Sequence, residues 1–94
     1  MTLQRFIIER DLPAIGSRES EQLRPALARS KDAMRRLGPD IQWGQSDVSD
    51  HKSYCIYLAS DKAVVRQHAE MAGLPVTRIV QINSIIDAAT ERPE

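Results

Sequence analysis

The chain has little of several things that would point directly to a function. Its single cysteine cannot form an internal disulfide, which is typical of proteins kept in a reducing cytoplasm. Thirteen basic residues balance 13 acidic ones, so electrostatics give no support to nucleic-acid binding. No apolar run approaches the length of a membrane span, and the N-terminus lacks the apolar core of a signal peptide. We therefore expect a cytoplasmic protein that binds neither nucleic acid nor membrane.

The chain also lacks the short motifs that carry common chemistries. It has no CxxC, HxH or HExxH spacing, so motifs alone indicate a metal site only weakly. It has no Gly-rich phosphate loop and no Ser, His and Asp in a hydrolase order. Its 94 residues, 41% hydrophobic and 28% charged, are typical of one small globular domain. We expect a single domain over residues 1–94, in which residues 88–94 have nothing to bury and form a frayed tail.

The most informative stretch is Ile41–Ala59, which we predict to be an antiparallel β-hairpin. Two runs rich in β-branched and aromatic residues are joined by a polar turn at Asp50 and His51. This stretch holds the only Trp, the only Cys, both Tyr and one of the two His. Any chemistry of the protein is therefore expected on or beside this hairpin.

Apolar residues at three- and four-residue spacing predict two amphipathic helices around the hairpin. The other predicted elements are a strand at Leu3–Arg10, a helix from about Ser17 to Leu37, a helix capped by Ser60–Asp61 and ended by Gly73, and a strand at Val76–Asp87. Pro25 conflicts with a straight first helix, so this helix either kinks there or begins nearer Ser20.

The element order strand, helix, strand, strand, helix, strand predicts a ferredoxin-like βαββαβ fold of the α+β class. Two right-handed crossovers then give one four-stranded antiparallel sheet with both helices on the same face. The first and last strands carry apolar residues on both of their faces, so the bare face of the sheet is too apolar to be left in water. A second copy, packed sheet against sheet about a two-fold axis, would cover it. We therefore expect a homodimer with the form of an α+β barrel.

Six short strings spread from residue 8 to residue 87 resemble those of a family of small bacterial ferredoxin-like proteins known as nickel-binding proteins. They are Ile8-Glu9-Arg10 with Pro13; Leu37-Gly38-Pro39 followed by Ile41 and Trp43; Lys52-Ser53-Tyr54-Cys55-Ile56-Tyr57; Arg66-Gln67-His68-Ala69; Gly73-Leu74-Pro75; and Ile86-Asp87. The resemblance implies a dimeric α+β barrel that binds Ni²⁺, and it does not exclude other divalent transition metals. His51 departs from the family, which more often has a small or acidic residue there, so His51 inherits no role.

The resemblance does not say which side chains bind the metal, so the candidates come from chemistry. Ni²⁺ accepts imidazole nitrogen, thiolate sulfur and carboxylate oxygen. His68 lies on the inner stripe of the second helix, where its imidazole either finds a hydrogen-bond partner or binds a metal. Cys55 is either an inert core thiol or a ligand near His68. If Cys55 and Glu9 point to opposite faces of the sheet, they cannot share one metal ion.

Glu9 is the third candidate ligand, near the end of the first strand. We take that strand and the second strand of the hairpin as parallel neighbours, and so expect Glu9 to lie level with Tyr57 and Leu58. Its carboxylate is a metal ligand, a catalytic acid or a salt-bridge partner of Arg5 or Arg78.

The remaining candidates have weaker assignments. Trp43, Tyr54 and Tyr57 either pack in the core or contribute to a pocket or the dimer face. His51 and Asp50, in the hairpin turn, could bind a metal adventitiously at the surface.

Three functions follow from these residues. The first is a metal-binding dimer that stores, buffers or delivers Ni²⁺. The second is a cofactor-independent oxygenase or isomerase, with His68 or Glu9 as general base on a small molecule in a pocket between sheet and helices. The third is a ligand-sensing or purely structural dimer.

Overall fold

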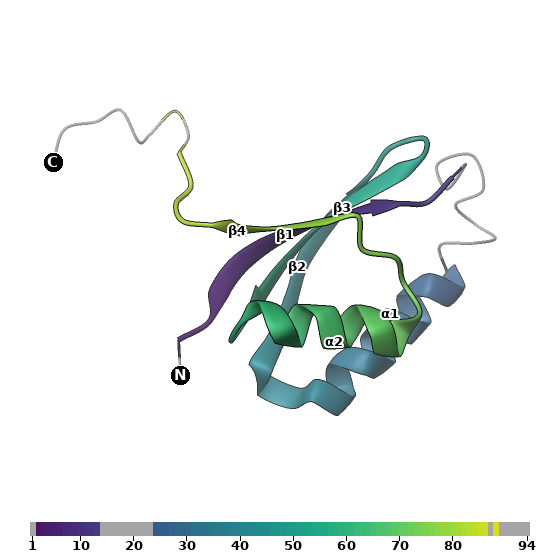
Figure 1. The fold of residues 1–94 in the computed structure, drawn as a ribbon, viewed down its shortest axis with the longest axis horizontal. Coiled ribbons are helices and arrows are strands. Elements are labelled where there is room, and N and C mark those ends of the chain that lie inside the picture. Colours follow the sequence, from purple (N-terminus) through teal and green to yellow (C-terminus); the bar gives the residue numbers. More distant parts are fainter. Residues whose placement is uncertain (1, 14–23, 87, 89–94) are drawn as a thin grey trace, which may run out of the picture.

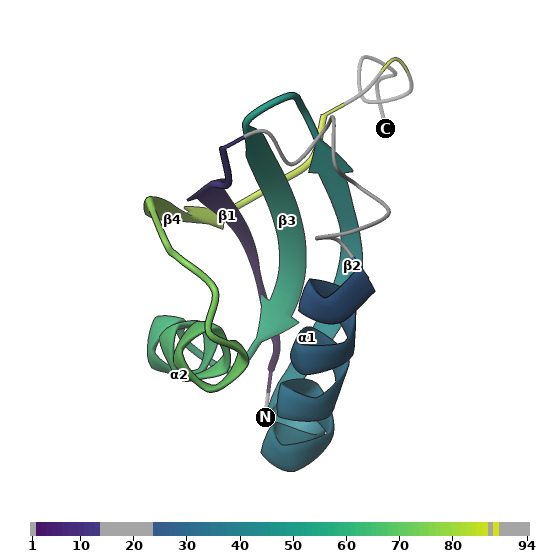
Figure 2. The same ribbon diagram turned by 90° about the vertical axis from the view of Figure 1, so that its right-hand side faces the viewer.

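The computed structural model describes residues 2–13, 24–86 and 88. Its elements are β1 (Gln4–Asp11), α1 (Arg24–Leu37), a 3₁₀ turn η3 (Gly38–Asp40), β2 (Ile41–Val48), β3 (Lys52–Ala59), α2 (Lys62–Ala72) and β4 (Arg78–Ile82). The four strands form one antiparallel sheet in the order β2-β3-β1-β4. Both helices lie on the same face of this sheet (Figures 1 and 2). The predicted ferredoxin-like βαββαβ fold is therefore confirmed.

The two central strands, β1 and β3, run antiparallel, and our expectation that they are parallel neighbours was wrong. Glu9 is paired with Tyr54 rather than lying level with Tyr57 and Leu58. The reason is topological. The crossover through α1 makes β1 and β2 parallel, and the hairpin turn reverses the chain, so that β3 lies antiparallel between them.

Successive side chains of a strand point to opposite faces of the sheet, so every second residue lies under the helices. Phe6 and Ile8 on β1 meet Tyr57 and Cys55 on β3, and all four are buried. The helices contribute small and branched side chains to the same core. These are Ala33 from α1 and Val65, Ala69 and Ala72 from α2. The inner stripes predicted for both helices are thus confirmed.

The helix ends follow the predicted capping residues. Asp61 is the N-cap of α2, where its carboxylate accepts a hydrogen bond of 3.0 Å from the backbone N–H of Val64. Gly73 ends α2 with φ of +67°, and Gly38 follows α1 with φ of +70°. The expected start of the first helix near Ser17 or Ser20 falls outside the described residues.

The last strand is shorter than predicted. β4 covers Arg78–Ile82 rather than Val76–Asp87, because its pairing with β1 ends at Arg5 and Ile82, near the beginning of β1. Beyond that point Ile85 and Ile86 are 60% and 78% exposed. Residues 89–94, most of the predicted frayed tail, lie outside the described residues. None of the described helices has the length and apolar character needed to cross a membrane.

The face of the sheet away from the helices, here called the bare face, is apolar at its centre, polar at the end that holds Glu9 and mixed at the end that holds Arg5. Its side chains are Arg78, Val80 and Ile82 on β4; Arg5, Ile7, Glu9 and Asp11 on β1; Lys52, Tyr54, Ile56 and Leu58 on β3; and Gln42, Gln45 and Asp47 on β2. Val80, Ile7 and Ile56 form the middle row, and each is only partly buried. The bare face thus has the apolar character that the sequence predicted.

The positive φ of Gly38 makes a testable prediction about stability. Gly38→Ala should lower the free energy of unfolding by about 1 kcal/mol, because a Cβ is disfavoured in left-handed backbone. No atom lies within 4 Å of the added Cβ, so backbone strain is the only expected cost. Denaturant unfolding measures the change. Gly38→Asn should retain most of the stability, and equal losses in the two variants would contradict this explanation.

Candidate functional site

His68 is fully buried between α2, α1 and the sheet. Its Nε2 lies 3.0 Å from Oγ of Ser30 and 3.3 Å from the backbone oxygen of Ser30. Its Nδ1 is buried and has no hydrogen-bond partner in the described part of the chain. Its ring lies 5.0 Å from the ring of Tyr57, at an interplanar angle of 56°. One nitrogen of the imidazole is therefore satisfied by the protein, as in a core histidine, and the other is left without a partner.

The environment of His68 keeps its imidazole neutral. Burial lowers the pKa of His68, and the positive charge of Arg10 lowers it further, against a smaller opposing effect of Ser30. Burial also raises the pKa of the Tyr57 hydroxyl. Burial under the helices thus disfavours the charged forms of both His68 and Tyr57. One other side chain in this interior is nevertheless permanently charged.

That charge belongs to Arg10, a residue that the sequence analysis did not single out. Arg10 follows Phe6 and Ile8 on the inward side of β1, and its side chain is 1% exposed. Its Nη1 donates a hydrogen bond of 2.8 Å to the carbonyl oxygen of Pro75. The alternation of Phe6, Ile8 and Arg10 was the signal that could have predicted its burial.

Cys55 lies on this same inner face and is buried, with its Sγ 3.7 Å from Oγ of Ser53. Together with His68 it would offer one thiol and one imidazole to a metal. A permanent positive charge nearby disfavours a divalent cation, and among the described residues no three His, Cys, Asp or Glu side chains converge on a common point. This interior therefore fits a nickel ion poorly.

Glu9 lies on the bare face, opposite to Cys55 across the sheet, so the two residues cannot bind one ion together. The antiparallel register brings Lys52 to Glu9, and Nζ of Lys52 is 2.6 Å from a carboxylate oxygen of Glu9 and 2.6 Å from one of Asp11. The salt-bridge partner is thus Lys52, not Arg5 or Arg78 as expected. The hydrogen bond from Lys52 is the largest cause of a lowered pKa of Asp11.

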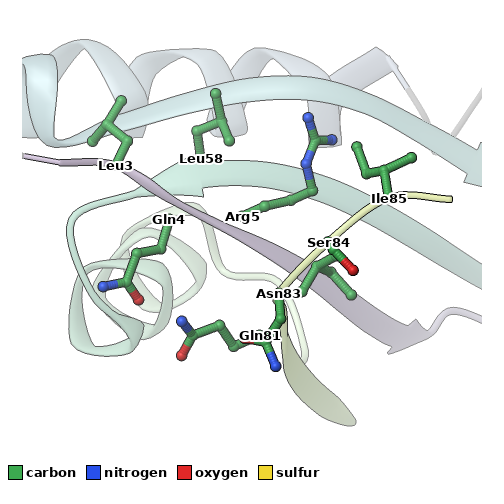
Figure 3. A pocket seen from close by; sticks show the side chains of 9 residues that line it. Leu3, Gln4, Arg5, Leu58, Gln81, Asn83, Ser84 and Ile85 are labelled. Atoms are coloured by element: carbon green, nitrogen blue, oxygen red, sulfur yellow. The ribbon is translucent and has the colours of Figure 1, made fainter. Parts of the chain in front are cut away.

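Two hollows include residues of the bare face in their walls. One has a volume of about 270 Å³ and is lined by Ile7, Glu9, Tyr54, Arg78 and Val80. The other, of about 450 Å³, lies at the opposite end of the strands, where Arg5, Leu58 and Ile85 contribute side chains (Figure 3). Glu9 is therefore the candidate ligand with open space in front of it.

The remaining candidate residues are likewise distributed between the helix-covered face, the bare face and the hairpin turn. Trp43 lies on the helix-covered face, packs against the core and donates from Nε1 to Oγ of Ser46 over 3.0 Å. Tyr57 is a core residue, while Tyr54 lines the hollow beside Glu9. His51 and Asp50 are exposed in the hairpin turn.

Comparison with known proteins gives the family. A family model described as "Nickel responsive protein SCO4226-like" matches residues 6–82, most of the chain. The chain belongs to this SCO4226-like family. Among solved structures, that of SCO4226 from Streptomyces coelicolor A3(2) is similar, with 23% identity and a TM-score of 0.58 over 87% of this chain and 99% of that chain. This similarity shows the fold. No curated protein matched the chain.

The family assignment confirms the resemblance predicted from the six strings of the sequence. In this SCO4226-like protein the candidate donors are divided by the sheet. Imidazole and thiol lie under the helices beside a buried arginine, and the carboxylates of Glu9 and Asp11 lie on the bare face beside a lysine.

The buried neutral imidazole of His68 predicts how stability depends on pH. Its folded pKa lies below the ordinary value of 6.5, so below about pH 6.5 the unfolded chain binds a proton that the folded chain does not. The free energy of unfolding should fall with decreasing pH, with a limiting slope of about 1.4 kcal/mol per unit between the two pKa values.

The measurement is denaturant unfolding between about pH 7.5 and about pH 5.5. His68→Gln should remove this part of the slope, whatever its effect on absolute stability. His51→Gln, which changes an exposed histidine, serves as the control and should retain it. An unchanged slope in His68→Gln would show that His68 is not the group responsible.

Proposed function

We propose that this protein is a cytoplasmic homodimer that binds Ni²⁺ for storage, buffering or delivery, and that the ion binds at the bare face of the sheet. Membership of the nickel responsive family supports the choice of metal. The proposed location of the ion rests on the position of Glu9, whose carboxylate lines an open hollow on the bare face.

The apolar centre of the bare face supports the dimer. Val80, Ile7 and Ile56 form a row across three strands with no helix above them. A second copy, packed sheet against sheet, would remove this row from water. The same contact would enclose the two hollows, which have volumes of about 270 and 450 Å³ in one copy.

The carboxylates of Glu9 and Asp11 support a cation site at one end of the bare face. Both have an oxygen 2.6 Å from the single ammonium of Lys52, so a positive charge is already favoured there. Because no three donors converge among the described residues of one copy, we propose that the second copy supplies the remaining ligands. Ni²⁺ would then compete with Lys52 for the Glu9 carboxylate.

The alternative enzyme, with a general base in the interior, has less support. The cavity between α1 and the sheet has a volume of about 50 Å³, and His68 is not among the residues that line it. A pocket for an organic substrate is usually several times larger, roughly 300 Å³ or more. Glu9 faces an open hollow but is occupied by Lys52.

The proposed dimer predicts that Ile7→Lys yields a monomer. A lysine in the apolar row would place a charge within the sheet-to-sheet contact, where it has no partner. Sedimentation equilibrium at micromolar concentration measures the mass, and circular dichroism checks that the variant is folded. Met71→Lys, at a 38% exposed position on α2, is the control and should remain a dimer. A monomeric wild type would refute the proposal.

Nickel binding is tested by isothermal titration of the protein without a histidine tag. Glu9→Gln should weaken Ni²⁺ binding by at least about tenfold, because an anionic donor is replaced by a neutral amide. Lys52→Met should strengthen binding, since the competing ammonium is removed. Glu70→Gln, on α2, is the matched carboxylate control.

Three results would count against this site. They are an absence of heat in the wild type, unchanged affinity in Glu9→Gln, and loss of binding in His68→Gln or Cys55→Ala while Glu9→Gln still binds. The last result would move the ion to the interior and leave nickel binding itself intact.

A further inference from the structure

The buried arginine points to a second, anionic ligand, independent of the nickel proposal. Arg10 is 1% exposed, and its buried Nη2 has no hydrogen-bond partner among the residues that the structure describes. A guanidinium keeps its charge at any pH the protein meets, so this group cannot become neutral on burial as an amine or imidazole can. A buried charge is costly unless an opposite charge or several hydrogen bonds compensate for it.

Among the described residues no carboxylate provides the opposite charge. The carboxylates nearest to Arg10 in sequence, Glu9 and Asp11, point to the bare face and are both bound by Lys52. Within residues 2–13, 24–86 and 88, Arg10 forms no ion pair. The carbonyl of Pro75 accepts a hydrogen bond from it, and the Tyr57 hydroxyl lies close enough for a hydrogen bond with Arg10 that opposes the rise in the pKa of Tyr57. The positive charge is felt by its neighbours, since Arg10 contributes to the lowered pKa of His68.

A cavity adjoins this charge. It lies between α1 and the sheet, has a volume of about 50 Å³ and is lined by Arg10 together with the side chains of Ser30, Ser53 and Tyr57, among others. A single water needs roughly 10 to 15 Å³ on this scale, so the cavity has room for a few atoms and not for a large molecule. The three hydroxyl groups can donate hydrogen bonds to oxygen, and to do so Ser30 and Ser53 would exchange their present contacts with Nε2 of His68 and Sγ of Cys55.

We propose that this cavity binds a small oxyanion, either a short carboxylate or an ion such as phosphate, that pairs with the guanidinium of Arg10. Charge-assisted hydrogen bonds from a guanidinium to an oxyanion are among the stronger ones in proteins. The hydroxyls of Ser30, Ser53 and Tyr57 would take up the remaining oxygens. Such a ligand would connect β1, β3 and α1 and would stabilise the folded state in proportion to the logarithm of its concentration.

Trp43, the only tryptophan, also lines this cavity and gives a direct readout. The experiment titrates acetate, phosphate and chloride, at one matched ionic strength, into the full-length protein while following Trp43 emission and the midpoint of thermal unfolding. We expect a saturable change in emission and a rise of the midpoint with acetate or phosphate. A response to acetate alone identifies a carboxylate, and a response to phosphate alone identifies an inorganic oxyanion.

Two variants assign the effect to the cavity. Arg10→Met should weaken anion binding by at least about tenfold. Arg66→Met, which removes an exposed arginine from α2, should leave it unchanged. Because Arg10→Met could fail to fold, Ala26→Leu provides a second test. It keeps the arginine but places a larger side chain at the wall of the cavity, and it should also abolish the response.

Four outcomes would overturn the proposal. They are no saturable response in the wild type, an equal response to chloride, an undiminished response in Arg10→Met, and an undiminished response in Ala26→Leu.

Discussion

The antiparallel pairing of β1 with β3 is the constraint on which the rest of the molecule depends. Eight residue pairs, from Gln4 with Ala59 to Asp11 with Lys52, align the two central strands. Because successive side chains of a strand point to opposite faces, this one register assigns every residue of both strands to the helix-covered interior or to the bare face. A shift by one residue would exchange the two sets.

The register places different functional groups on the two faces of the sheet. The interior receives a thiol, an imidazole and a guanidinium along with the aromatic and aliphatic core, and it retains a positive charge. The bare face receives the carboxylates of Glu9 and Asp11, which attract cations. A metal ion and an anion would therefore be directed to opposite sides of the same sheet, and neither site would need to disturb the other.

The helices cover only one face of the sheet. Among the described residues two helices accompany four strands, and both lie on the same face. They leave the apolar row on the other face uncovered, and in the proposed dimer a second copy would remove it from water. Burial of Arg10 in the core beneath the helices is a cost to stability, and such costs are usually retained in proteins where a ligand or a specific contact depends on them.

The amino-acid sequence by itself determined the elements, their caps and the alternation of buried and exposed positions. These are local properties. The N-cap of α2 at Asp61, its end at Gly73, the end of α1 before Gly38 and the buried stripes of both helices were predicted correctly, while the predicted start of the first helix lies outside the described residues. The short β4 was missed because a strand ends where its partner ends, whatever its own β-propensity.

Only the tertiary structure decided which side chains meet. The salt bridge of Glu9 with Lys52 joins positions 43 residues apart, and the contact of Arg10 with Pro75 joins positions 65 apart. Both follow from the order and direction of strands in the sheet, which no local spacing specifies. For that reason the sequence identified the candidate metal-binding residues. Only the fold showed which face of the sheet each of them occupies, and that the charge of Arg10 is buried.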